Sequence, residues 1–445
     1  MFPGPPLLAR GRLSIALGSR WRRPVIPPPP VWPVFLLSIM GIGLSLLPRA
    51  SVAQSVAVDG IVAGRAIAAF GRPTWLEGEY GRLSEGAEAP GERDAHFRGL
   101  AHLGLDWKPG ERFRIHVHGV ARMEPGTYGG DPAGVTEVFT QFREEMSPGT
   151  SIRFRAGTLF PGTSRENTQP IWSSPYTLTL SALNTWTGEE LRLTGLETAV
   201  TTGAAGGELQ LAATAFGVND TLGALLAWRG WTMNDRLTTL GELLPLPPLA
   251  SFRPGGGFAD QRDDGTRPFQ ELDGRVGWQA RARWERPQRA AMELSYLDNR
   301  GDRELRHGQY SWATRFWTAG GEIRLGLVTL VGEAAAGETG MGRQDAVHVD
   351  MDFRAGYVLA SWASSKARLT ARYDRFKNVD RDGTAEPNDE TGDAWTLAAF
   401  WLPVPRFRLG IEWLDLRADR PAAAASGANP NTNGRRLEVE ARLTF

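Results

Sequence analysis

Hydrophobic and polar residues alternate one by one in many segments of this chain. In residues 112–123 the odd positions are mostly apolar and the even positions mostly basic: Phe113, Ile115, Val117 and Met123 against Arg112, Arg114, His116, His118 and Arg122. Residues 275–285 repeat this scheme. A period of two predicts strands with one apolar and one polar face, and segments of ~9–13 residues suit a tilted membrane strand. A soluble sandwich also alternates, but here the strands are long and many apolar faces end in Trp or Tyr. The pattern predicts an all-β protein, a transmembrane antiparallel β-barrel.

The connections between these segments alternate in length, which supports the barrel. Short turns on one side and long loops on the other are typical of outer-membrane barrels. The short turns lie near residues 108–110, 147–150, 286–287, 319–320, 364–365 and 403–405, and the long polar loops near 71–94, 124–133, 299–307, 336–346, 379–392 and 418–433.

This alternation of short turns and long loops predicts sixteen strands. They are expected at 58–70, 95–107, 111–123, 134–146, 151–160, 189–200, 207–217, 272–285, 288–298, 308–318, 321–335, 347–361, 366–378, 393–402, 405–417 and 434–445. Two further segments, 176–186 and 221–230, would give eighteen strands. We assign both to loops because their alternation fails, and 221–230 favours a short helix.

Two connections are longer than the others. Residues 161–188 are polar and leave a strand that carries Arg153 and Arg155, so we expect this loop to fold into the barrel and narrow it. Residues 218–271 are rich in Pro and Gly and are expected to form a long extracellular loop.

The two ends of the chain agree with export to the outer membrane. Residues 1–53 combine an Arg-rich start, an apolar run at 34–47 and a small-residue cleavage site, which is typical of a signal peptide. The barrel would then occupy residues 54–445. The last segment alternates up to Phe445, as assembly signals of outer-membrane proteins do, so the expected location is the cell outer membrane.

Composition narrows the choice of function. Cysteine is absent, which excludes disulfides, thiol nucleophiles and cysteine metal sites. Acidic and basic residues number 50 each, without a basic block, so a nucleic-acid partner is not expected. The expected partners are outer-membrane lipid and small hydrophilic or anionic solutes. A homotrimer and a monomer both stay open.

The segment around the inward loop resembles the phosphate-selective porin (O and P) family of Gram-negative bacteria. The resemblance rests on residues 153–157, on Phe160-Pro161, on Glu166 and on residues 189–192, about 50 residues in all. It implies a sixteen-strand porin whose inward loop carries an acidic residue. Selective members of that family are lined with many lysines, whereas this chain has only Lys108, Lys366 and Lys377.

Arginine on the polar strand faces is the main candidate for function. Guanidinium stays charged and binds carboxylate or phosphate in a bidentate manner, so a ring of Arg in a pore attracts anions. The alternative is that each Arg pairs with a lumen acid, such as Glu166, Glu189, Glu190, Asp350 or Asp352, and stiffens the wall. The candidate pore-lining residues are Arg112, Arg114, Arg153, Arg155, Glu166, Glu189, Glu190, Arg192, Arg281 and Arg283, and further polar-face arginines are Arg122, Arg368 and Arg372.

Four histidines share the polar face of two neighbouring strands: His96, His102, His116 and His118. The turn at 108–110 would place His102 opposite His116, or opposite His118 if the register of the hairpin is shifted. Three of them could ligate Zn²⁺ or Cu²⁺, but no fourth ligand is placed, so ordinary pore-lining histidines and no cofactor are expected.

Catalytic motifs are absent, and an enzyme is not expected. The first hypothesis is a porin for passive diffusion of small hydrophilic solutes, tending toward anions, through an Arg-lined pore. The second is a barrel with a plugged lumen whose extracellular loops bind ligands or surface partners.

Overall fold

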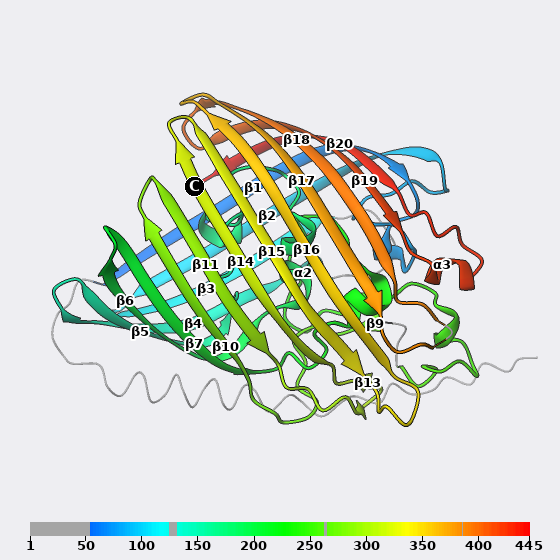
Figure 1. Ribbon diagram of the computed structural model, residues 1–445. Helices are drawn as coiled ribbons and strands as arrows, with labels where there is room; N and C mark the ends of the chain where they lie inside the picture. Colours follow the sequence, from blue (N-terminus) through cyan, green and yellow to red (C-terminus); the bar gives the residue numbers. More distant parts are fainter. Residues whose placement is uncertain (1–53, 124–130, 262–264, 385) are drawn as a thin grey trace, which may run out of the picture. The chain divides into compact units, whose positions relative to one another are not determined.

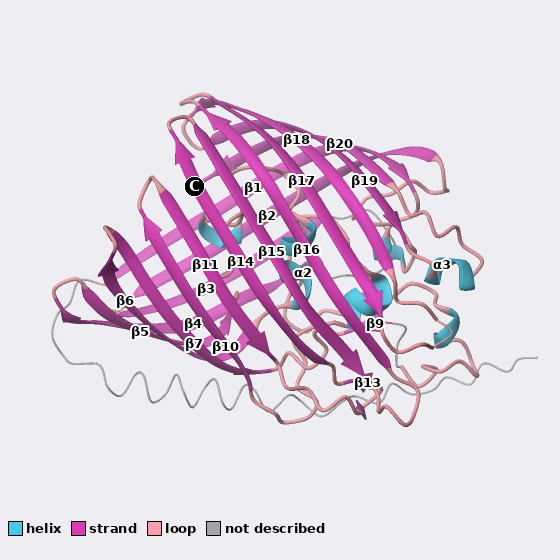
Figure 2. Ribbon diagram, viewed as in Figure 1, coloured by secondary structure: helices cyan, strands magenta, loops and turns pink. Residues whose placement is uncertain are grey.

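The barrel is visible in the computed structural model, which describes residues 54–123, 131–261, 265–384 and 386–445. Sixteen antiparallel strands of this part of the chain form one closed sheet, in which each strand pairs with the next one and β20 returns to β1 (Figures 1 and 2). The predicted fold class, the strand number and the closure of the first strand against the last are thus confirmed.

The sixteen wall strands are β1 (Ser55–Gly71), β2 (Glu92–Lys108), β3 (Phe113–Met123), β4 (Ala133–Ser147), β5 (Thr150–Leu159), β6 (Leu193–Ala204), β7 (Gly207–Gly217), β10 (Gly277–Arg286), β11 (Ala290–Asp298), β14 (Ala313–Leu325), β15 (Val328–Met341), β16 (Val349–Ala363), β17 (Ala367–Asp380), β18 (Glu390–Val404), β19 (Phe407–Asp419) and β20 (Gly434–Thr444). The predicted signal segment, 1–53, lies outside the described residues.

Short elements occupy the long connections. They are two small hairpins, β8 (Leu244–Pro245) with β9 (Gly265–Thr266) and β12 (Leu305–Arg306) with β13 (Gln309–Tyr310), and the helices η1 (Trp75–Glu77), η2 (Pro170–Trp172), α2 (Ala182–Glu190), η3 (Leu225–Arg229), η4 (Ala250–Phe252) and α3 (Ala422–Ala425). The described residues include no helix that is long and apolar enough to cross a membrane. Segments 176–186 and 221–230 stay out of the wall, and the second contains the helix η3, as predicted.

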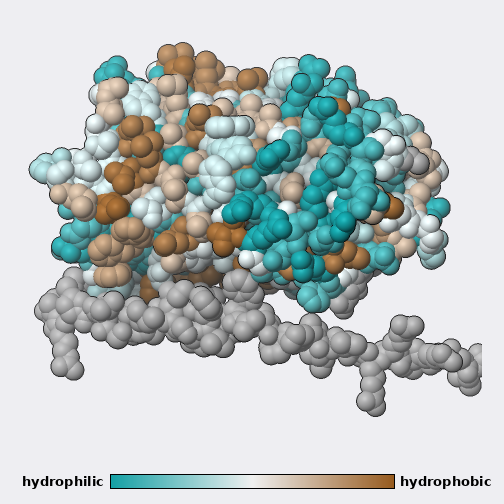
Figure 3. Space-filling model, turned by 60° about the horizontal axis from the view of Figure 1, so that its bottom comes forward, coloured by the Kyte–Doolittle hydropathy of each residue, from teal (hydrophilic) through white to brown (hydrophobic). Residues whose placement is uncertain are grey.

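The period of two sorts the side chains of each strand. In β1 the even positions Val56, Val58 and Val62 are exposed on the outer face, whereas Arg65 points inward and is fully buried. Aromatic side chains pair across neighbouring strands on the outer face, with ring centroids 5.2 Å apart for Trp278–Tyr296 and 4.8 Å for Tyr296–Trp317. Apolar surface gathers over one part of the face in Figure 3 and hydrophilic surface over another, as expected of a barrel with a lipid-facing band.

One hairpin differs from the prediction. The turn expected at residues 319–320 lies instead at Gly326-Leu327, between β14 and β15. The Ala-Gly-Gly run resembles a turn, but Gly320 is an inward-facing strand residue. A side chain there would begin 3.0 Å from Cγ of Arg165, a residue of the inward loop. The glycine therefore makes room for that loop.

The strand expected at 189–200 was also placed wrongly. It begins at Leu193, because Glu189 and Glu190 end helix α2. Its faces are reversed as well: Leu193 points inward and is buried, and Thr194 lies on the outer face. The predicted lumen position of Asp350 and Asp352 is likewise wrong, because the inward residues of β16 are the odd-numbered ones.

Candidate functional site: the barrel lumen

The loop between β5 and β6 crosses the lumen. It leaves the wall after Leu159, runs through η2 and α2, and returns at Leu193. Its contacts lie on β15, β17 and β19, and β17 stands eight places from β5 in the sixteen-strand order. The loop therefore spans the barrel from one wall to the wall that faces it.

Glu166 fixes the middle of this loop. Its carboxylate forms an ion pair with Arg372 of β17 and accepts hydrogen bonds from the Ser181 backbone N–H and the Asn184 side chain, both at 3.0 Å. Glu166 and Arg372 are both fully buried. Arg372 also donates to the carbonyl oxygens of Thr179 and Leu180 at 2.8 and 3.0 Å, so one guanidinium holds two parts of the loop.

Two acids of the wall bind the extended part of the loop. Glu412 of β19 accepts the backbone N–H groups of Leu178 and Thr179 at 2.5 and 3.0 Å, and Asp374 of β17 accepts that of Ala182 at 3.1 Å. A buried backbone N–H needs an acceptor, and among the described residues no strand pairs with this extended segment. The wall carboxylates accept the N–H groups that the carbonyls of a neighbouring strand would accept in a sheet.

Helix α2 ends the inward part of the loop. Ser181 caps its first turn by accepting the Asn184 N–H at 3.1 Å. At its other end Trp186 donates to Glu190 at 2.6 Å, and Glu189 forms an ion pair with Arg229 of η3. Glu189 and Glu190, two predicted pore-lining residues, are thus fully buried between two loops.

Residues 218–261 and 265–276, between β7 and β10, also reach into the lumen. Asp235 lies between Arg65 of β1 and Arg98 of β2, at 2.8 and 2.5 Å. Burial alone would raise the pKa of Asp235, but these two arginines and Arg436 lower it far below its usual value. Many residues of the predicted 218–271 loop are therefore buried against lumen-facing side chains, and its extracellular position stays a prediction.

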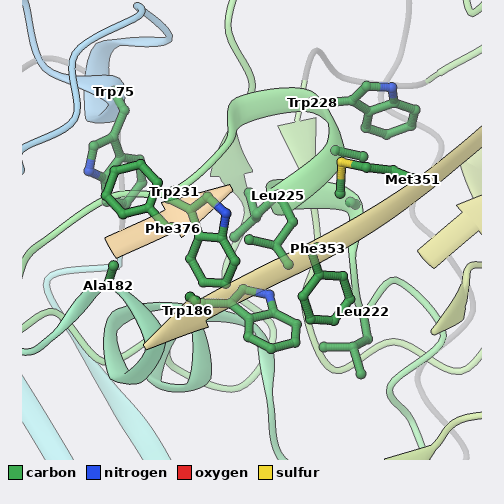
Figure 4. Close-up of a cluster of buried hydrophobic side chains, with 14 of the residues drawn as sticks. Trp75, Ala182, Trp186, Leu222, Leu225, Trp228, Trp231, Met351, Phe353 and Phe376 are labelled. Atoms are coloured by element: carbon green, nitrogen blue, oxygen red, sulfur yellow. The ribbon is translucent and has the colours of Figure 1, made fainter. Parts of the chain in front are cut away.

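A large hydrophobic core lies inside the barrel wall, where three connections meet (Figure 4). Trp75 comes from the β1–β2 connection, Trp186 from α2, and Trp228 and Trp231 from the β7–β10 connection. Trp186 packs with its ring centroid 5.9 Å from that of Trp231 and 5.2 Å from that of Phe353 on β16. Inward-facing apolar side chains thus hold the loops together.

Arginines gather where the inward loop leaves the wall. Arg155 of β5 donates to Glu197 of β6 through two nitrogens at 2.9 and 2.8 Å, and Arg153 donates to the same carboxylate at 3.1 Å. Arg281 of β10 approaches it to 3.5 Å. Three predicted pore-lining arginines therefore share one buried acid.

The other predicted residues are spread around the lumen. Arg112, Arg114 and Arg283 lie toward the short turns and pair with Glu144, Asp106 and Glu285, at 2.8, 2.5 and 2.5 Å. Arg192 is fully buried and precedes β6; it donates to main-chain carbonyls, and its guanidinium carbon lies 3.5 Å from the centroid of the Phe160 ring.

The histidines of β2 and β3 all face inward, but the predicted register is wrong. His102 lies opposite Val120 in the ladder, and His118 lies opposite Gly104. The two rings meet diagonally, with Nδ1 of His102 3.3 Å from Nε2 of His118. His116 instead contacts Asp106 at 2.8 Å. Within the described residues, only Asp220, Glu271 and Asp273 bring three potential metal ligands together.

No protein-family model and no curated protein matches this chain. The structure is similar to the outer membrane channel DcaP of Acinetobacter baumannii, with TM-score 0.51, 12% identity, and coverage of 89% of this chain and 99% of that one. It is also similar to an anion-selective porin from Comamonas acidovorans, with TM-score 0.51, 10% identity, and coverage of 88% of this chain and 100% of that one. A third similar structure is Salmonella typhi OmpF in complex with daunomycin, with TM-score 0.50, 10% identity, and coverage of 88% of this chain and 97% of that one. The chain has the porin fold. Such barrels span the outer membrane of Gram-negative bacteria, and we place the protein there.

One inward-facing residue of this barrel was missed from the sequence. Glu197 is the shared partner of the root arginines, yet the predicted faces of residues 189–200 put it toward lipid. The alternation Glu197, Ala199, Thr201 against Leu196, Thr198, Val200 could have corrected the face, because its even positions include the larger apolar side chains.

Proposed function

We propose that the protein is an outer-membrane channel for small hydrophilic solutes, with a preference for anions. The observation that carries the proposal is the position of Arg153, Arg155 and Arg281, which surround one carboxylate at the root of a loop that crosses the lumen. The loop narrows the barrel, and these fixed charges would act on each solute that passes its root.

The local charge balance supports an anion preference. Three guanidinium groups share Glu197, and Arg281 also lies 3.9 Å from Glu293, so three cations contact two acids. The side chains of Arg153 and Arg155 keep 26% and 14% of their surface accessible. Arg192, just before β6, donates to the backbone carbonyls of Thr136 and Leu191. A pore section with excess positive charge in a water-poor setting attracts anions. One of the similar structures is described as an anion-selective porin, which agrees with this proposal.

Small spaces remain between the inward loop and the wall of β1, β2 and β20, away from the loop root. Two cavities of about 30 and 20 Å³ adjoin His102 and Asp235 there. Spaces of this size hold no more than a water molecule or two. On this side of the lumen a solute could pass only if the inward loop or residues 235–237 shifted.

Planar-bilayer recordings test the proposal. The wild-type porin should give steady single-channel conductance and a reversal potential on the anion side of zero in a salt gradient. Arg153→Gln with Arg155→Gln should move the reversal potential toward cations. Arg381→Gln is the control, because Arg381 is exposed and pairs with Asp352 on the outer face. Equal shifts in both variants would contradict a constriction at the loop root.

Phosphate is one candidate solute, on the resemblance to the phosphate-selective family. Inorganic phosphate added to chloride solutions should then reduce the chloride current at concentrations far below that of chloride. The effect of sulfate on the chloride current, at the same total added charge, is the comparison. Equal effects of both anions would favour a general anion channel.

The hydrophobic core in the lumen favours a second candidate function. Barrels with loops packed this tightly can be closed, and their long loops can bind ligands or surface partners instead of conducting. Absence of steady conductance from correctly folded wild-type protein would favour this second function over the first.

A further inference from the structure

The outer face of the barrel carries a cluster of cations near the long-loop ends of β16 and β17. Arg354 of β16 lies directly across the ladder from Lys377 of β17, and Arg375 stands two residues from Lys377 on the same face. Arg354 and Arg375 are exposed and Lys377 is half-buried. Like charges directly opposed on a sheet, ~4.5–5.5 Å apart at Cβ, repel each other, so the pair needs a counter-ion.

None of the three cations forms an ion pair with an acid among the described residues. Within the described residues, no carboxylate oxygen lies within 4.0 Å of a side-chain nitrogen of Arg354, Arg375 or Lys377. Asp393 faces Arg375 across the next ladder without such a contact, and Asp352 is paired with Arg381. Three cations thus have one opposed carboxylate, Asp393, and the cluster keeps a net positive charge on the outer face of the barrel.

More cations lie on the same face, two strands farther on. Arg417 of β19 and Arg435 of β20 both contact Asp415, at 3.2 and 2.6 Å, and are about two-thirds exposed. Asp419 stands two residues from Arg417 on the same face, and Asp393 of β18 lies opposite Arg417 in the ladder, so acids balance these two arginines. The excess positive charge therefore lies at Arg354, Arg375 and Lys377.

A shallow groove begins beside the cations. It has a volume of about 720 Å³ and is lined by Ala334, Ala336, Gly356, Val358 and Tyr373 together with the three cations. Small side chains on β15 and β16 form its floor, and Tyr373 of β17 forms a side. Arg354 and Arg375 are the last charged outward residues of their strands before this apolar surface. Cations thus border an apolar groove, as a charged headgroup borders its acyl chains in a lipid.

We propose that this surface binds a phosphorylated, multiply acylated glycolipid of the outer leaflet, with phosphate on Arg354, Arg375 and Lys377 and an acyl chain in the groove. Long loops of outer-membrane barrels face outside, which puts the cluster in the outer leaflet. Guanidinium binds phosphate in a bidentate manner, and Lys adds a point charge. The proposal rests on the outer-membrane location and is independent of conductance.

Binding of purified bisphosphorylated lipid A to the full porin in detergent micelles, measured by native mass spectrometry, tests the proposal. Wild type should retain the lipid, and the triple variant Arg354→Gln, Arg375→Gln, Lys377→Gln should lose about tenfold or more in affinity, because charge-assisted contacts are removed. Lys366→Gln is the matched control, since Lys366 lies at the short-turn end of the same hairpin. Heat-modified gel mobility shows that each variant is folded.

Binding of dephosphorylated lipid A to the wild-type protein gives a second test, which does not depend on any variant. This lipid should bind much more weakly than the bisphosphorylated form. Equal binding of both lipids, or equal loss in the triple variant and Lys366→Gln, would overturn the proposal. A triple variant that changes oligomeric state but retains lipid would instead identify this face as an interface between copies of the chain, and would overturn it too.

Discussion

Glu166 and Arg372 form an ion pair across the barrel, although 206 residues separate them in the chain. Glu166 belongs to the loop that leaves β5, and Arg372 to the wall strand that faces it. Both side chains are buried, and each also holds backbone groups of the loop. The pair therefore fixes how far the loop reaches into the lumen.

Replacing Glu166 with Ala should release the loop and lower stability. Arg372 would lose its loop partner but keep Asp374, 2.8 Å away. Removing one partner of a buried ion pair costs about 3–5 kcal/mol, and Asp374 should reduce that cost to the lower end. Urea unfolding measures the free energy, and bilayer recordings should show larger or noisier conductance.

Asp352→Asn is the control for that change. Asp352 pairs with Arg381 on the exposed outer face, and exposed pairs contribute only about 0–1 kcal/mol. A comparable loss of stability in both variants would mean that Glu166 has no special role in holding the loop.

Trp231→Ala should loosen the core inside the barrel. Trp231 is buried against Trp186 and Phe353, and its indole N–H donates to Asn378 at 2.7 Å. Truncating a buried aromatic residue costs about 3–5 kcal/mol, because a cavity replaces its contacts. Unfolding in urea should show this loss, whereas Trp278→Ala on the outer face should cost less. Similar losses at both positions would contradict a packed core in the lumen.

The wall was predictable because each strand repeats one physical rule. Lipid outside and polar groups inside force a period of two, and strands such as β7 were located from it to the residue. The rule failed where the lumen is apolar. The inward face of β16 carries Met351, Phe353 and Leu359, so in the sequence this face resembles one that contacts lipid. Alternation alone shows two faces without showing which one faces inward.

Contacts inside the lumen were predictable only in part. That residues such as Arg372 lie on a polar strand face follows from the alternation. That Arg372 meets Glu166 depends on the path of a loop with no regular period. Gly320 shows the same limit, because its role depends on Arg165, which approaches from a distant part of the chain.

The histidines should not form a zinc site. His102 and His118 meet as a pair, and His118 Nδ1 lies 2.9 Å from the Thr136 hydroxyl. His116 contacts Asp106, so it does not complete a third ligand position. Titration of the wild-type protein with Zn²⁺ at neutral pH should therefore give no heat of binding. A one-site isotherm that disappears in His118→Ala would show the opposite.

Glu197→Gln should make the channel more selective for anions. The carboxylate is almost fully buried and is shared by Arg153, Arg155 and Arg281. Without its charge, the three cations at the loop root keep one close contact with an acid among the described residues, that of Arg281 with Glu293 at 3.9 Å, so the net positive charge rises. Fixed charges there act over about one Debye length, ~8–10 Å at physiological salt. The reversal potential in a salt gradient should shift toward anions, opposite in sign to the shift in Arg153→Gln with Arg155→Gln. Glu338→Gln removes one charge from an exposed pair with Arg315 on the outer face and should leave the potential unchanged. If Glu197→Gln and the arginine variant shifted the potential in the same direction, the three arginines would not be the charges that passing ions meet, and the solute path would have to lie away from the root of the inward loop.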